Sequence, residues 1–230
     1  MMKRIGLLGG MSWESSVEYE RLINEGVREH LGGTASGDLI VRSYNFAEIE
    51  ELQERDDWAR AGEILAADAV WMEAAGAEAI VLCTNTMHKV ADVIEAAIHI
   101  PLIHIADATA TAVHAADIHR VAVMGTRYTM EQAFYVDRLA RHGLDVMIPD
   151  EPDRTTIHDI IFEELVRGEI VAGSKRRYLD AVDRLVDRGA EGVIAGCTEI
   201  ELLIGPDDVP VPFFPTTAIH AAAAVEFVLD

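Results

Sequence analysis

Short apolar runs alternate with longer segments of helical periodicity along the chain. The apolar runs have the length and the β-branched residues of buried strands, and turn-forming residues bound them. In the first half they cover residues 4–8, 39–44, 79–82 and 101–105. Apolar residues recur at helical spacing in the segments 13–30, 49–52, 58–75, 89–97 and 106–116. Strands that alternate with helices are typical of βα units, so the pattern predicts an α/β protein with parallel sheets.

The second half of the chain repeats landmarks of the first half in the same order. The matched segments are 4–10 with 120–126, 76–84 with 189–198, and 100–104 with 211–215, at offsets between 111 and 116 residues. Matches in the same order at a nearly constant offset indicate two pseudo-symmetric copies of one parallel α/β domain. We expect a first domain of residues 1–105 and 212–230, to which a C-terminal helix returns, and a second domain of residues 106–211.

Composition and charge narrow the class of protein. Hydrophobic residues make up 50% of the chain, which is enough for a sizeable core, and the formal net charge is −21. An acidic chain of this kind lacks the basic surface that nucleic acids and anionic membranes require, so we expect neither as a partner. No stretch approaches the roughly twenty apolar residues of a membrane helix, and the N-terminal residues lack the pattern of a secretion signal. We therefore expect a cytoplasmic location.

Two cysteines occupy equivalent positions in the two copies. Cys83 and Cys197 each follow an apolar run, and each precedes a threonine. Ligands of parallel sheets bind beyond the carboxyl ends of the strands, so two copies related by a pseudo-dyad would direct both cysteines into one cleft. A helix N-terminus close behind the thiol would lower its pKa and make it reactive. The alternative for each cysteine is a small buried hydrophobic residue at the end of a strand.

A pair of thiols on opposite sides of a cleft suits racemisation at a carbon next to a carboxylate. One thiolate removes the proton from one face, one thiol returns a proton to the other face, and the roles exchange with the enantiomer. The unperturbed thiol pKa of about 8.5 needs only modest tuning for this task. The histidines are too scattered to be metal ligands, and no lysine follows a strand in a pattern that suggests a pyridoxal Schiff base. We therefore expect no metal and no cofactor.

Three segments resemble the signature segments of the aspartate/glutamate racemase family, namely residues 8–11, 83–88 and 196–199. The similarity extends to residues 46–53 and 157–162. The resemblance implies a cofactor-independent racemase with an active site in the cleft between two α/β domains, usually a homodimer. It implies that Cys83 and Cys197 are the catalytic residues, because some relatives replace the first cysteine by threonine and this chain does not. The implied substrate is a small amino acid with an acidic side chain, aspartate, glutamate or both.

The resemblance also implies contacts to the substrate backbone. Thr84, Asn85 and Thr86 would bind the α-carboxylate through N–H and hydroxyl groups, matched from the second copy by Thr198. Simple helix capping is the alternative for each of them. Glu199 would contact the substrate amine or orient the neighbouring cysteine, although a glutamate in the first turn of a helix is also unremarkable.

The remaining candidate residues lie in loops or would bind the side-chain carboxylate of the substrate. Met11 belongs to the turn after the first strand, and Thr126 mirrors that turn in the second copy, where it would touch substrate or only shape the loop. Gln53 matches a polar substrate-contacting position in some relatives. Arg167 lies where the family often carries a cation for the side-chain carboxylate, although it would equally suit a helix C-terminus before glycine. No arginine lies among residues 45–52, where aspartate-preferring relatives often have one, which argues against strict aspartate specificity.

Two other functions fit parts of this pattern. The same site with one cysteine as a nucleophile would suit an isomerase or a decarboxylase of a dicarboxylic acid. A non-catalytic module that binds a dicarboxylate would need the hydrogen-bond donors but not the pair of thiols. Incorporation of solvent deuterium at Cα distinguishes a racemase from such a module.

Overall fold

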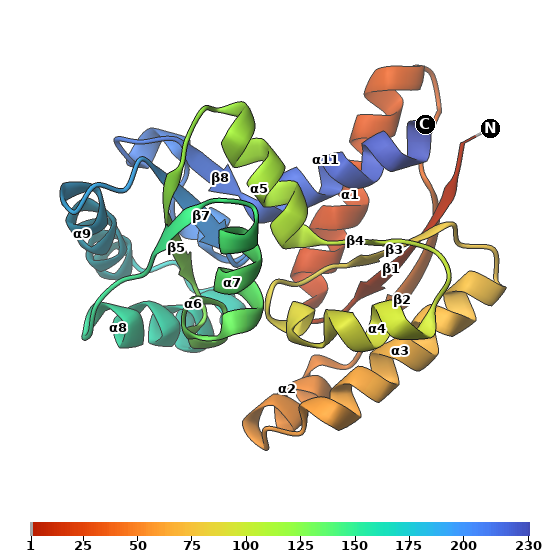
Figure 1. Cartoon of the computed structure of the whole chain (residues 1–230), viewed down its shortest axis with the longest axis horizontal. Coiled ribbons are helices and arrows are strands. Elements are labelled where there is room, and N and C mark those ends of the chain that lie inside the picture. The colour runs from red at the N-terminus through yellow and green to blue at the C-terminus, as the bar shows by residue number, and fades with distance from the viewer. Residues whose placement is uncertain (1) are drawn as a thin grey trace. The chain divides into compact units, whose positions relative to one another are not determined.

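The computed structural model describes residues 2–230, which fold into two compact units. The first unit consists of the residues up to Ile105 together with His220–Asp230, and the second consists of Ala106–Ile219. Each unit is built on its own four-stranded sheet, and all strand pairs in both sheets are parallel (Figure 1). The predicted α/β fold with two parallel-sheet domains is confirmed.

The two sheets have the same strand order. It is β2-β1-β3-β4 in the first unit and β6-β5-β7-β8 in the second. The strands of the first sheet are β1 (Arg4–Gly9), β2 (Asp38–Ser43), β3 (Ala79–Leu82) and β4 (Leu102–Ile103). Those of the second are β5 (Arg120–Gly125), β6 (Asp145–Met147), β7 (Gly192–Gly196) and β8 (Phe213–Pro215). The identical order supports the internal duplication that the sequence predicts.

Equivalent polar contacts mark the duplication at the level of single residues. The guanidinium Nε of Arg4, the first residue of β1, donates to Asp38 at 3.0 Å. Arg120, the first residue of β5, donates in the same way to Asp145 at 2.6 Å. In each unit a glutamate carboxylate also accepts from the backbone N–H of this arginine. These glutamates are Glu78 and Glu191.

The boundary near the C-terminus differs from the sequence expectation, which assigned residues 212–230 to the first domain. Strand β8 pairs with β7, beginning at Val193↔Phe213, and so completes the second sheet. Without β8, the buried strand β7 would leave backbone N–H and C=O groups unpaired on that side. The chain therefore returns to the first unit only at His220, within helix α11 (Thr216–Leu229).

Helices cover both faces of the first sheet, which explains why its central strands are almost continuously apolar. One face packs against α1 (Trp13–Leu31) and the part of α11 that belongs to this unit. The other face packs against α2 (Phe46–Glu54), α3 (Trp58–Ala74) and α4 (Ala91–Ala97). The segment predicted as one helix over 89–97 begins as a 3₁₀ helix, η1 (Thr86–Val90), and continues as α4.

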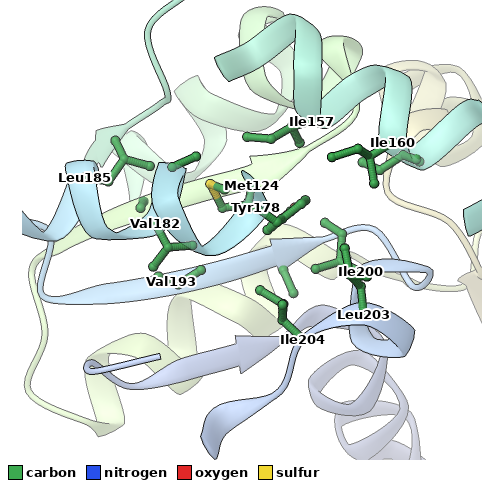
Figure 2. Close-up of a cluster of buried hydrophobic side chains, with 14 of the residues drawn as sticks. Met124, Ile157, Ile160, Tyr178, Val182, Leu185, Val193, Ile200, Leu203 and Ile204 are labelled. Atoms are coloured by element: carbon green, nitrogen blue, oxygen red, sulfur yellow. The ribbon is translucent and has the colours of Figure 1, made fainter. Parts of the chain in front are cut away.

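The second unit has a separate core. Its helices are α5 (Ile105–Ala115, whose first residue belongs to the first unit), α6 (Arg127–Glu131), α7 (Ala133–Arg141), α8 (Asp153–Asp159), α9 (Ala172–Asp187) and α10 (Ile200–Leu203). The shorter turns are a π-helix, η2 (Ile160–Glu164), and two 3₁₀ helices, η3 (Leu165–Arg167) and η4 (Pro206–Asp208). Side chains of α8, α9 and α10 pack around Met124 and Val193 of the sheet, as Figure 2 shows. None of the helices in residues 2–230 combines the length and the apolar character needed to cross a membrane.

His220 ties the returning end of α11 into the first unit. The Tyr19 hydroxyl donates to His220 Nδ1 at 2.8 Å, and His220 Nε2–H donates to the Ile103 carbonyl at 2.6 Å. The carbonyl can only accept, so the proton of the neutral ring lies on Nε2. Complete burial of the side chain lowers the pKa of His220 to about 4.

We expect acid to weaken the fold through His220. The unfolded chain binds a proton at this residue near its ordinary pKa of about 6.5, whereas the folded protein does so only near 4. Protons therefore favour the unfolded state as the pH falls through this window, by about 2 kcal/mol between pH 7 and pH 5. Urea titrations of the wild type and of His220→Gln, which does not titrate, measure this difference. Equal losses of unfolding free energy in the two proteins would rule out His220 as the responsible group.

Candidate active site

Cys83 lies directly after β3, in the apolar cluster that α1 and α11 cover. Its backbone N–H donates to the Leu8 carbonyl at 2.9 Å, which holds the residue beside the end of β1. The side chain is fully buried, and burial raises the pKa of the Cys83 thiol well above its usual range. The prediction of a lowered pKa is therefore wrong for Cys83. The helix behind it is the five-residue η1, and desolvation of the thiolate outweighs the dipole of so short a helix.

The loop that connects Cys83 to η1 is unusually buried. Thr84 is half-buried, and Asn85 and Thr86 are only 5% and 8% exposed. Asn85 occupies the N-cap position of η1, yet its side chain makes no capping hydrogen bond. Helix capping, the alternative considered for Asn85, is therefore not its role.

The first unit places two further predicted residues around η1. Gly10 has a φ of +83°, and a Cβ atom there would collide with the backbone of Tyr44, so the turn requires glycine. The next residue, Met11, is buried in the same apolar cluster as Met87 of η1. Gln53 is also buried, and its side-chain amide donates to Met87 Sδ at 3.1 Å.

In the second unit, Thr126 and Cys197 leave the sheet from neighbouring strands. The glycines that precede them, Gly125 and Gly196, are paired across β5 and β7. A Cβ atom on Gly125 would lie 3.1 Å from the Gly196 carbonyl oxygen, so the small residues allow this close approach. The Thr126 hydroxyl accepts from the backbone N–H of Thr129 and caps α6, which is the simpler of the two roles considered for it.

The Glu199 carboxylate lies beside Cys197. The Cys197 thiol donates to Glu199 Oε2 at 2.9 Å, and the glutamate side chain is buried. Desolvation and the Glu199 carboxylate together raise the pKa of the Cys197 thiol far above its usual value. The prediction of a lowered pKa is therefore wrong for this cysteine too. The arrangement allows the thiol to pass its proton to a carboxylate within hydrogen-bond distance, which is the geometry of an acid–base pair.

Two predicted residues of the second unit remain, Thr198 and Arg167. Thr198 stands between Cys197 and Glu199 in the chain and is half-buried. Arg167 is exposed at the end of η3, which packs against α10. Gly168 follows it in the left-handed conformation, with a φ of +74°. The backbone of Arg167 therefore ends η3 before a glycine, as the helix-terminal role considered for it predicts.

Two buried side chains near the cysteines are not among the predicted site residues. Tyr178 of α9 is fully buried, and the pKa of its phenol is raised by burial and by the nearby Cys197. Helical spacing could mark Tyr178 only as a core residue. His88 of η1 is 2% exposed and bonds to the Thr84 carbonyl. Over residues 2–230, no group of three or more His, Cys, Asp or Glu side chains is arranged to hold a metal ion.

Comparisons with known proteins extend these observations. The chain matches the Asp/Glu/hydantoin racemase family over residues 8–224. A Yersinia pestis protein described as a candidate Asp/Glu racemase has a similar crystal structure, with a TM-score of 0.95 and 50% identity over 100% of both chains. An aspartate racemase homologue from Pyrococcus horikoshii OT3 has a TM-score of 0.87 and 33% identity, again over 100% of both chains.

A more distant relative is the broad specificity amino-acid racemase RacX of Bacillus subtilis. It is 24% identical over 165 residues, which are 68% of this chain and 67% of that protein. The family match covers nearly the whole chain and includes both cysteine segments and the glycine turn after β1. On this evidence, the chain belongs to the Asp/Glu/hydantoin racemase family.

Proposed function

We propose that this protein is a cofactor-independent racemase of acidic amino acids, with Cys83 and Cys197 as its two bases. The contact between the Cys197 thiol and the Glu199 carboxylate carries the proposal, because it supplies a thiol with a proton acceptor beside it. The first unit has a second cysteine at the equivalent strand end. A module that only binds a dicarboxylate would need hydrogen-bond donors but no such acid–base pair.

In the proposed reaction, a thiolate takes the proton from Cα, and the electron pair of the broken C–H bond delocalises into the α-carboxylate. The thiol of the other cysteine then delivers its proton to Cα from the opposite face. Glu199 generates the Cys197 thiolate by accepting the thiol proton. Cys83, whose pKa is raised by burial, is a thiol at rest and serves as the acid in this direction.

The raised pKa values suit the difficulty of the reaction. The proton on Cα of an amino acid is very weakly acidic, so a thiolate of ordinary basicity removes it only slowly. A thiolate of higher pKa is less populated but is a stronger base. A carboxylate within hydrogen-bond distance can accept the thiol proton directly when the thiolate forms. The site must also stabilise the charge that develops on the α-carboxylate. We assign this role to Thr84, Asn85 and Thr86 and, from the second unit, to Thr198.

We propose that both aspartate and glutamate are substrates. RacX is named for broad specificity, and the Pyrococcus homologue is named for aspartate. The segment 45–52 of this chain lacks the arginine associated with strict aspartate preference. Arg167 is the cation that we assign to the side-chain carboxylate, because an acidic protein needs a local positive charge to hold a dicarboxylate.

We expect purified protein in heavy water to incorporate deuterium at Cα of aspartate and glutamate, and to produce the opposite enantiomer. Chiral chromatography with mass spectrometry measures both events, and alanine, which lacks the side-chain carboxylate, serves as the control substrate. The activity should persist in hydroxylamine, which inactivates pyridoxal enzymes. Release of CO₂ without return of the amino acid would support the decarboxylase alternative. Binding without any deuterium incorporation would support the non-catalytic module.

A further inference from the structure

His88 connects the loop after Cys83 to the start of α5. Its Nδ1–H donates to the Thr84 carbonyl at 2.7 Å, and the backbone N–H of Ile105 donates to its Nε2 at 3.2 Å. A carbonyl can only accept and an N–H can only donate, so these partners define a neutral ring with its proton on Nδ1. His88 is thus a buried bridge between the Thr84 carbonyl and the backbone N–H of Ile105, which lies 17 residues after His88 in the sequence.

The ring of His88 is held in place by two further histidines. His104 packs against it with a centroid distance of 4.4 Å, and His220 does so at 5.8 Å. Both neighbours are buried, and His220 is itself anchored to Tyr19 and to the Ile103 carbonyl. The packing restricts rotation of the His88 ring, so its Nδ1–H stays directed at the Thr84 carbonyl.

Fixing this carbonyl also fixes an N–H group of the proposed carboxylate-binding segment. The peptide between Thr84 and Asn85 is planar, so its C=O and N–H groups point in opposite directions. A carbonyl anchored to His88 therefore directs the Asn85 N–H away from the histidine cluster. Rotation of this peptide would turn the N–H away from any ligand bound above the loop.

We propose that His88 is a positioning residue, which acts through the Thr84–Asn85 peptide to hold the backbone donors that bind the substrate α-carboxylate. This inference rests on the proposed racemase function and deepens it. The bond from Nδ1–H to the Thr84 carbonyl transmits the effect. The bond at Nε2 anchors the ring against Ile105.

Two substitutions separate these bonds. In His88→Asn, the side-chain amide can donate from the position of Nδ1, which keeps the bond to Thr84 and loses the one to Ile105. In His88→Gln, the amide oxygen can accept near the position of Nε2, which keeps the bond to Ile105 and loses the one to Thr84. Each variant loses one buried hydrogen bond, so their thermal stabilities should be similar.

We expect the kcat/KM of His88→Gln to lie about tenfold or more below that of His88→Asn, mainly through a higher KM, because a displaced carboxylate donor weakens binding of the substrate. Tyr19→Phe is the matched control. It removes a buried hydrogen bond of the same histidine cluster but leaves the bonds from His88 to Thr84 and Ile105 in place, so it should lower the melting temperature and change KM far less than His88→Gln does. Equal kcat/KM values for the two His88 variants would overturn the inference. Absence of racemisation in the wild type, measured in the same series, would instead refute the proposed function.

A measurement on the wild type keeps the inference testable if both variants misfold. Nitrogen-15 spectra of the histidine rings report which ring nitrogen carries the proton. His88 should carry it on Nδ1, and its Nδ1 signal should shift when aspartate saturates the protein. A proton on Nε2 of His88, or a signal that does not respond to aspartate, would contradict the assigned role.

Discussion

Replacing either cysteine by serine should abolish net racemisation while leaving the fold intact. In the proposed mechanism each direction needs a base on one face of Cα and an acid on the other, so loss of either thiol stops both directions. Serine is nearly isosteric with cysteine, but its hydroxyl is far too weak an acid to form the resting base. General acid–base assistance is worth roughly 10² to 10⁴ per group, so we expect a loss of several powers of ten for Cys83→Ser and for Cys197→Ser.

The two variants should nevertheless differ in a way that identifies the role of each cysteine. Each variant keeps one thiol, which faces the α-proton of only one enantiomer. An amino acid with a good leaving group on the β-carbon can eliminate after proton abstraction, without any return of a proton. On such substrates the two variants should therefore eliminate from opposite enantiomers. A shared preference for one enantiomer, or racemisation close to the wild-type rate in either variant, would exclude the two-base assignment.

Strand pattern and repetition in the sequence were sufficient to predict the architecture of this protein. Strands such as Ala79–Leu82 are buried on both faces and must therefore be apolar throughout, so the sequence alone predicts them as strands. The repeat predicts that the second sheet has the strand order of the first, as the structure shows. The expected C-terminal boundary at residue 212 is wrong and also conflicts with the repeat, because the match of residues 211–215 to 100–104 predicts that β8 pairs with β7 as β4 pairs with β3.

The electrostatics of the site could not be predicted in the same way. A position near a helix N-terminus suggested a lowered thiol pKa for Cys83, but the sign of the shift depends on how completely the side chain is buried. For Cys197 the sign also depends on the Glu199 rotamer that brings a carboxylate to the sulfur. Residues two apart in a loop need not face each other, so their spacing carries no information about this contact. The bridge from His88 to Ile105 is likewise a tertiary contact between residues that no sequence motif connects.

Removing the charge of Glu199 should slow racemisation without removing its hydrogen bond to Cys197. In Glu199→Gln the amide oxygen can still accept from the thiol, but it cannot take the proton. We expect kcat to fall by roughly 10²-fold or more, because the Cys197 thiolate must then form without its proton acceptor. The equilibrium constant between two enantiomers is unity, so kcat/KM must fall equally in both directions. The asymmetry should therefore appear in elimination from β-substituted substrates, where only the enantiomer deprotonated by Cys197 should react more slowly.

The same substitution should change the Cys197 thiol in the opposite sense. Because the Glu199 carboxylate helps to raise the pKa of this thiol, its removal should lower that pKa and move the alkylation of Cys197 by iodoacetamide to lower pH. Glu201→Gln is the matched control, because Glu201 also raises the pKa of Cys197 through its charge but lies two residues further along the chain than Glu199. It should shift alkylation slightly in the same direction and leave kcat close to that of the wild type.

Equal losses of kcat in the two variants would mean that Glu199 acts only through its charge. A wild-type kcat in Glu199→Gln would remove Glu199 from the mechanism. A more reactive thiol combined with slower racemisation would identify Glu199 as the group that takes the Cys197 proton.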